Sequence, residues 1–220
     1  MTVTINSIRA AAARLKNVAI TTPLISNTFL DEKMKARVFI KPECLQHIGA
    51  FKFRGAYNRL SQLSNEERQL GVVAFSSGNH AQGIALAAKL LNIRATIVMP
   101  SDAPKIKLEG TQRLGASVRE YQRATESREE IAGEIARTTG ATLVPAFDDY
   151  EIMAGQGTVG LEIVDQLAEQ SLLPDVVLTP CGGGGLLAGT STAVKSIIPK
   201  ATVYGVEQEN FDDHYLSKQA

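Results

Sequence analysis

From Gly71 onward, short runs of β-branched and apolar residues alternate with longer segments whose apolar residues recur at helical spacing. The pattern predicts strands at 72–75, 94–99, 116–121, 142–144, 175–179 and 201–206. It predicts helices at 81–91, 103–114, 125–139, 157–170 and 185–198. Strand and helix in regular succession indicate an α/β fold, in which parallel sheets carry helices on both faces.

Before Gly71 the pattern predicts a helix at 5–15, a strand at 37–41 and a helix from about Phe51. Two polar, turn-rich segments, 64–71 and 145–154, separate periodic regions and are the expected crossings between two lobes. We therefore expect a large lobe made of residues 1–66 and 150–220, and a small lobe made of residues 67–149.

The composition favours a globular protein that handles small molecules. The 220 residues are 44% hydrophobic, and Lys+Arg and Asp+Glu are both 23, so no basic surface for nucleic acid is expected. Cys44 and Cys181 lie far apart and form no CxxC pair, which fits a reducing, cytoplasmic setting. No apolar run is long enough to span a bilayer, so we expect no membrane association.

A glycine-rich turn, Gly182-Gly183-Gly184-Gly185, follows a predicted strand and opens a predicted helix. Backbone N–H groups can turn onto a phosphate there without obstruction by Cβ atoms, and the helix N-terminus adds partial positive charge. A loose dinucleotide fingerprint, Gly183-x-Gly185-x-x-Ala188 with Glu207 after the next strand, also fits NAD. The turn alone does not separate NAD from another phosphorylated cofactor.

Two other loops carry candidate chemistry. Ser76-Ser77-Gly78-Asn79-His80 follows a buried strand, and its donors suit a carboxylate or a ring oxygen, although capping of the next helix is an equal alternative. Lys52 lies between Phe51 and Phe53, where desolvation would lower its pKa and free the amine to form a Schiff base. A solvated surface lysine is the alternative.

Four motifs in order resemble the signature of the serine/threonine dehydratase and serine racemase family, which belongs to the fold-type II pyridoxal-phosphate (PLP) enzymes. They are segments 49–56 (GAFKFRGA), 76–80 (SSGNH), 154–158 (AGQGT) and 182–185 (GGGG). The resemblance extends from about Thr22 to the C-terminus. It implies a two-lobed fold similar to the tryptophan synthase β chain, and it implies the cofactor pyridoxal 5'-phosphate.

The resemblance also implies roles for individual residues. Lys52 would bind the cofactor covalently and act as the base, and Ser77 would be a second catalytic group on the opposite ring face. The other implied cofactor contacts are Phe51, Asn79, Gly182, Gly183, Gly184, Gly185 and Leu186. The implied substrate contacts are Ser76, Ser77, His80 and Arg128, with Arg128 directed at an acidic substrate group.

Similarity to racemase-like members further implies a divalent cation held by Glu207, Phe211 and Asp213. Oxygen ligands favour Mg²⁺ or Ca²⁺, and a solvated acidic turn is the alternative. The implied reaction is α,β-elimination of ammonia from L-serine, L-threonine or a related 3-hydroxy amino acid, with serine racemisation as an additional activity. The family also implies a homodimer.

The chain is shorter than the family's usual catalytic domain. We therefore expect the C-terminal part of the large lobe to be missing, with apolar surface exposed as a result. This keeps open the hypothesis of a truncated non-catalytic remnant, and the dinucleotide fingerprint keeps open that of an NAD-dependent oxidoreductase. The sequence does not distinguish between serine, threonine and hydroxyaspartate as the substrate.

Overall fold

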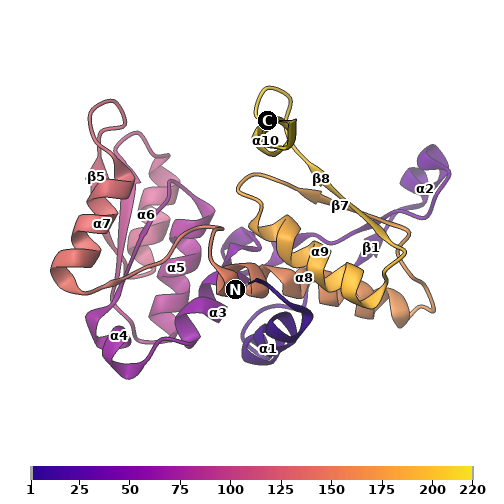
Figure 1. The fold of residues 1–220 in the computed structure, drawn as a ribbon, viewed down its shortest axis with the longest axis horizontal. Coiled ribbons are helices and arrows are strands. Elements are labelled where there is room, and N and C mark those ends of the chain that lie inside the picture. Colours follow the sequence, from indigo (N-terminus) through magenta and orange to yellow (C-terminus); the bar gives the residue numbers. More distant parts are fainter. Residues whose placement is uncertain (1, 220) are drawn as a thin grey trace.

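In the computed structural model, which describes residues 2–219, two groups of elements lie side by side (Figure 1). The first contains a four-stranded sheet with its helices, and the second contains the long helices α8 (Tyr150–Ala168) and α9 (Gly185–Ile197) with a two-stranded sheet. Helix α3 (Lys52–Ser61) packs against both groups, because it contacts α5 (Asn79–Leu90) on one side and α8 on the other.

The four-stranded sheet is parallel throughout and has the order β5-β4-β3-β6. Its strands are β3 (Val72–Phe75), β4 (Ala95–Pro100), β5 (Ser117–Tyr121) and β6 (Thr142–Leu143). Val72 and Ile97 pack in a cluster with α5, whereas Val73 and Val98 pack in a cluster with α7 (Arg128–Thr139). Alternate residues of one strand thus face opposite helical layers, which confirms the expected sheet covered on both faces.

The second group is held together by close helix contacts. Strands β7 (Val176–Pro180) and β8 (Thr202–Val206) form a parallel pair, and α9 packs against α8. A Cβ atom at Gly189 would lie 2.6 Å from the backbone N of Gly157, so the two helices touch through their glycines. The segment 154–158 therefore lies inside α8, where its small residues serve helix packing.

A buried ion network fixes the start of α3. Arg54 is 1% exposed and donates to both oxygens of Glu43, at 2.8 Å each, and to both oxygens of Glu162, at 2.5 and 2.9 Å. Lys41 adds a second cation 2.6 Å from Glu162. Because these buried charges are paired and hydrogen-bonded, they join α3, α8 and the segment 41–43, which precedes α3.

Short elements complete the described chain: α1 (Ile5–Leu15), β1 (Ile25–Ser26), α2 (Thr28–Met34), β2 (Phe39–Ile40), α4 (Asn65–Leu70), α6 (Lys105–Arg113) and α10 (Asp213–Gln219). Two 3₁₀ turns, η1 (Glu43–Leu45) and η2 (His47–Gly49), precede α3. The segment 64–71, expected to be a turn-rich crossing, instead contains α4, which begins with a Ser64/Glu67 capping box. Helix α8 begins at Tyr150 and not at Gly157, because Asp149 caps it.

The division into lobes at residues 66/67 and 149/150 stays a prediction. The four-stranded sheet falls within the stretch assigned to the small lobe. Among residues 2–219, none of the helices combines the length and apolarity that crossing a bilayer would require.

Candidate active site

One short loop, residues 144–147, brings the predicted motifs together. Lys52 Nζ donates to the carbonyl of Ala146 at 2.7 Å, and His80 Nε2 lies 3.1 Å from the carbonyl of Val144. The Phe147 ring occupies the space that a Cβ atom of Gly183 would fill. The lysine, the start of α5 and the glycine turn are therefore all in contact with one loop, although they are distant in sequence.

Lys52 is the first residue of α3, and the chain reaches it through a tight turn. Ile48 and Gly49 both have positive φ, 60° and 69°, and the β-branched Ile48 is strained in this conformation. Lys52 Nζ lies 5.4 Å from the centroid of the Phe51 ring. Burial lowers the pKa of Lys52 from 10.5 to about 8, so near neutral pH far more of the amine is uncharged than in an exposed lysine.

The loop 76–80 leads into α5, which packs against the backbone of Lys52. A Cβ atom at Gly83 would lie 3.3 Å from the carbonyl carbon of Lys52. Ser76 Oγ accepts from the N–H of Gly78 at 3.1 Å, which shapes the loop, and Ser77 is exposed. The loop thus presents Ser77 to solvent at the carboxyl end of β3, next to the lysine-bearing helix.

His80 is buried, with 3% exposure. Burial, with a smaller contribution from the positive charge of Lys52, lowers its pKa to about 4, so the ring is neutral at pH 7. With the proton on Nε2, the ring donates to Val144 and leaves Nδ1 as an acceptor, for which the described residues supply no partner. Its predicted contact with a substrate carboxylate stays a prediction.

Asn79 has a contact that the sequence did not predict. The Lys107 ammonium, from α6, donates to Asn79 Oδ1 at 2.8 Å. An ammonium group has no acceptor, so this bond fixes which end of the amide faces the lysine. The Nδ2 donor of Asn79 is left for another acceptor.

The glycine turn connects β7 to α9. Gly184 has a φ of 78°, which glycine adopts without strain, and a Cβ atom at Gly182 would meet no atom within 4 Å. A Cβ atom at Gly185 would lie 3.1 Å from Phe147 Cα. Leu186 follows in the first turn of α9, where unpaired backbone N–H groups favour an anion.

Sequence reasoning missed Phe147 and the carbonyl of Ala146. The signal that could have identified them is positional, because residues 144–147 follow β6 and residues 76–80 follow β3. These strands are parallel neighbours, so both loops emerge at the same edge of the sheet.

Arg128 is the first residue of α7, and its guanidinium carbon lies 5.2 Å from the centroid of the Phe75 ring. Phe75 ends β3, directly before Ser76, so Arg128 stands beside the predicted substrate loop. Arg128 Nε also donates to Glu129 Oε1 at 2.7 Å.

The predicted metal ligands lie at the end of β8 and the start of α10. Both oxygens of Glu207 accept from backbone N–H groups, of His214 at 3.1 Å and of Tyr215 at 3.0 Å. Asp213 begins α10, and Phe211 is exposed in the preceding turn. This arrangement gives Glu207 a capping role, and its role with Phe211 and Asp213 as metal ligands stays a prediction.

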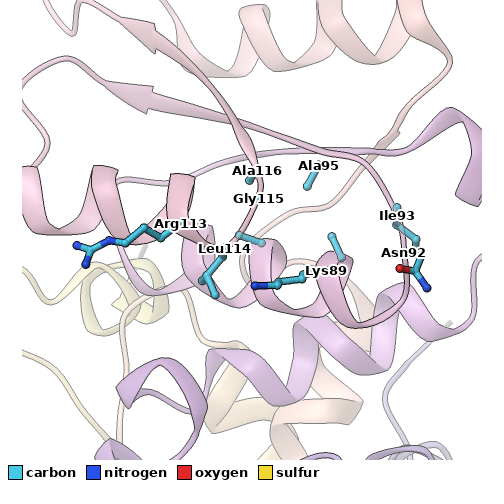
Figure 2. A pocket seen from close by; sticks show the side chains of 10 residues that line it. Lys89, Asn92, Ile93, Ala95, Arg113, Leu114, Gly115 and Ala116 are labelled. Atoms are coloured by element: carbon cyan, nitrogen blue, oxygen red, sulfur yellow. The ribbon is translucent and has the colours of Figure 1, made fainter.

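A separate pocket lies near the amino ends of strands β4 and β5, at the other end of the strands from the loops 76–80 and 144–147 (Figure 2). It is lined by the ends of α5 and α6 and by Ala95 and Ala116 near the amino ends of β4 and β5; Lys89 and Arg113 are also among its residues. In a parallel α/β sheet, ligands bind at the carboxyl ends of strands. The geometry therefore favours the loops around Lys52 as the active site over this pocket.

Residues 15–220 match the family model described as pyridoxal-phosphate dependent enzyme. The chain belongs to this family. The resemblance inferred from the four motifs and the fold-type II architecture are thereby confirmed, and pyridoxal phosphate is favoured over a dinucleotide.

The proteins that this chain resembles carry the names of different activities. The chain is 45% identical to the L-threo-3-hydroxyaspartate ammonia-lyase of Saccharomyces cerevisiae, over 92% of the chain and 61% of that protein. It is 46% identical to the L-threonine ammonia-lyase of Thermotoga maritima, over 94% of the chain and 51% of that protein. The structure of maize serine racemase matches with a TM-score of 0.94 and 39% identity, covering 100% of the chain and 65% of the maize protein. The chain thus spans about half to two thirds of the length of these relatives.

Proposed function

We propose that this chain is the PLP-binding part of an ammonia-lyase that removes ammonia from a small 3-hydroxy amino acid. One observation carries the proposal. The partly buried amine of Lys52 is held on the Ala146 carbonyl, and the next residue, Phe147, contacts the glycine turn. An amine and an anion-binding turn joined by one loop are what an aldehyde with a phosphate group requires.

The residues of the site fit the cofactor. The lowered pKa of Lys52 favours attack of its amine on an aldehyde. The turn Gly182–Gly185 and the amide of Leu186 would hold the phosphate, since a Cβ atom at Gly182 would enter open space. Phe51, which precedes the lysine, would pack against the ring.

Asn79 would bind the ring hydroxyl. Because Lys107 occupies the Oδ1 acceptor of Asn79, the group that stays free is the Nδ2 donor. This donor suits an acceptor such as a phenolate oxygen. This support depends on two side chains from different helices, α5 and α6.

When bound, the pyridine ring supplies an acceptor for the electron pair left at the substrate α-carbon. The residues of the chain would transfer the protons. Lys52, with a pKa lowered to about 8, would act as the base that removes the α-proton of the substrate. Ser77, exposed at the end of β3, would return a proton from the other face in racemisation. The neutral His80 adds no second positive charge beside Lys52.

The substrate carboxylate would bind to the donors of the loop 76–80, including Ser76 and Ser77. Arg128, held over Phe75 beside this loop, would donate hydrogen bonds to a second carboxylate of the substrate. This position favours an acidic substrate such as the 3-hydroxyaspartate in the name of the Saccharomyces cerevisiae relative.

The proposal further includes that the protein binds a divalent cation, forms a homodimer and is located in the cytoplasm. Glu207, the Phe211 carbonyl and Asp213 offer oxygen ligands only, which suit Mg²⁺ or Ca²⁺. A cation at this set would stabilise the folded chain, so an unchanged melting temperature across a Mg²⁺ and EDTA series would count against it.

A non-catalytic, cofactor-binding remnant is the second candidate. It is favoured by the apolar face of β7 and β8, where Leu178 is 67% and Val206 50% exposed. Catalysis by the chain alone separates the two candidates.

The proposal is tested by release of keto acid from L-serine, L-threonine and L-threo-3-hydroxyaspartate, together with the chirality of the remaining substrate. We expect turnover by the wild-type chain and a loss of at least about 10²–10⁴-fold in Lys52→Ala, because the base and the covalent anchor are removed together. Lys89→Ala, an exposed lysine of the separate pocket, is the matched control and should retain full activity. Undiminished turnover by Lys52→Ala would refute the proposal, and cofactor binding without turnover in the wild type would favour the remnant.

A further inference from the structure

Three side chains that commonly bind metal ions meet beside the glycine turn. Cys181 directly follows β7, Glu207 directly follows β8, and His214 lies in the first turn of α10. One ligand atom from each residue lies within 4.8 Å of those from the other two. Parallel pairing of β7 with β8 produces this meeting, since the N–H of Cys181 extends the ladder to the Val206 carbonyl at 2.8 Å.

Two of these side chains are already oriented by other hydrogen bonds. The carboxylate of Glu207 accepts from the backbone N–H groups of His214 and Tyr215 and still has free lone pairs. His214 Nε2 lies 2.6 Å from the carbonyl of Gly182. With its proton on Nε2, the ring donates to Gly182 and keeps a lone pair on Nδ1, which is the usual arrangement of a metal-binding histidine and its outer partner.

From this geometry we propose that Cys181, Glu207 and His214 form a binding site for a borderline-soft divalent metal ion of the Zn²⁺ class. Sulfur, nitrogen and oxygen together are the ligands that Zn²⁺ takes, and three protein ligands leave a fourth position for water. Bond lengths of about 2.0–2.3 Å would place the ligand atoms about 3.5 Å apart, so side-chain movements of about 1 Å suffice.

This site differs in chemistry from the oxygen ligands Glu207, Phe211 and Asp213. Both sets use Glu207, so one ion excludes the other, and the thiolate selects the softer ion. A bound ion would join the end of β7 to α10. Because His214 also contacts Gly182, the ion would restrain the turn that is proposed to hold the phosphate.

The test is a Zn²⁺ titration of the full 220-residue chain, in competition with a chromophoric chelator and without added cofactor. We expect one Zn²⁺ per chain, with affinity at least about 10-fold weaker in Cys181→Ser and in His214→Gln. Cys44→Ser removes the other free cysteine, which is exposed, and should leave the affinity within about twofold of wild type. Asp213→Asn should do the same, because Asp213 belongs only to the oxygen set.

Substitution with Co²⁺ keeps the test decisive if a variant folds poorly. The wild-type chain and Cys44→Ser should both show a thiolate-to-metal charge-transfer absorption, and Cys181→Ser should lack it. The site is refuted if the wild type binds no Zn²⁺, or if Cys181→Ser binds it as tightly as the wild type. Loss of Zn²⁺ in Asp213→Asn but not in Cys181→Ser would also overturn it, by placing the ion on the oxygen ligands.

Discussion

Lys52 and His80 share one environment, the loop 144–147, and burial shifts the pKa of each downward. The consequence differs between them. Lys52, with a pKa of about 8, retains a proton at pH 7 but releases it readily, whereas His80, with a pKa of about 4, is neutral. The site therefore contains one group ready to exchange a proton and one neutral group that holds the loop in place.

The neutral state of His80 makes stability depend on pH. Unfolding returns its pKa from about 4 to 6.5, so the unfolded chain binds more protons between these values. The stabilisation is fully present above about pH 6.5 and is lost as the pH falls through about 4. We expect the wild type to lose about 3 kcal/mol more than His80→Gln between pH 7 and pH 4, measured by urea unfolding.

His47→Gln, which removes a histidine outside the site, is the control for this measurement. Equal pH dependence in the wild type and His80→Gln would show that His80 is not buried in its neutral form.

At the scale of single residues, the four successive glycines indicated an anion-binding turn, whereas Lys52 between two phenylalanines indicated a desolvated amine only together with the family resemblance. The roles of these residues in cofactor binding stay predictions. Phe147 and Lys107 were missed, because a phenylalanine in a loop and a lysine on a helix are common. Their roles depend on how α6 and the loop after β6 fold back, which no local pattern encodes.

At the scale of elements, glycine spacing sets how closely the helices approach. A Cβ atom at Gly155 of α8 would lie 2.6 Å from the Cα atom of Gly55 in α3. Since α3 begins with Lys52, this crossing helps to fix the position of the amine. The motif 154–158 thus acts on the site through the packing of α8 against α3.

Gly155→Ala should therefore destabilise the chain by about 1–3 kcal/mol, because the added methyl group must push two helix backbones apart. Gly133→Ala is the matched control, since Gly133 lies in α7 and its Cβ atom would meet nothing within 4 Å. There the higher helix propensity of alanine should stabilise by up to about 1 kcal/mol. Denaturant unfolding measures both, and a stabilising Gly155→Ala would contradict the close crossing.

Periodicity predicted most elements well and some not at all. The predicted strand 72–75 and helix 5–15 coincide with β3 and α1. Helix α8 was predicted to start late, because Gly155 and Gly157 look like helix breakers when their packing partners are unknown. The short helices α4 and α10 are too brief for a hydrophobic period to mark them.

At the scale of the whole molecule, the site is assembled from both groups of elements (Figure 1). The glycine turn belongs to the group of α8 and α9, the loop 76–80 belongs to the four-stranded sheet, and α3 carries Lys52 between them. Two polar, turn-rich segments and the family resemblance predicted two lobes, and the boundaries of these lobes stay a prediction. The sequence did not predict the strand order β5-β4-β3-β6, because pairing between distant strands leaves no local signature.

The outer face of β7 and β8 carries apolar side chains that the described residues leave exposed. Val176, Leu178, Tyr204 and Val206 are 50–67% exposed there, so a contiguous apolar surface adjoins the glycine turn. Apolar surface of this kind marks an interface or an aggregation risk. Binding of the cofactor should therefore be measured at low chain concentration, where self-association is least.

The central claim, that Lys52 is the amine that captures the aldehyde of pyridoxal phosphate, is tested most directly by locating the covalent bond. The chain is incubated with the cofactor, reduced with borohydride, digested and analysed by mass spectrometry. We predict one pyridoxyl group per chain, on the peptide that contains Lys52, and none on the same peptide of Lys52→Ala. A label on another lysine such as Lys89 or Lys107, or equal labelling of Lys52→Ala, would contradict the account.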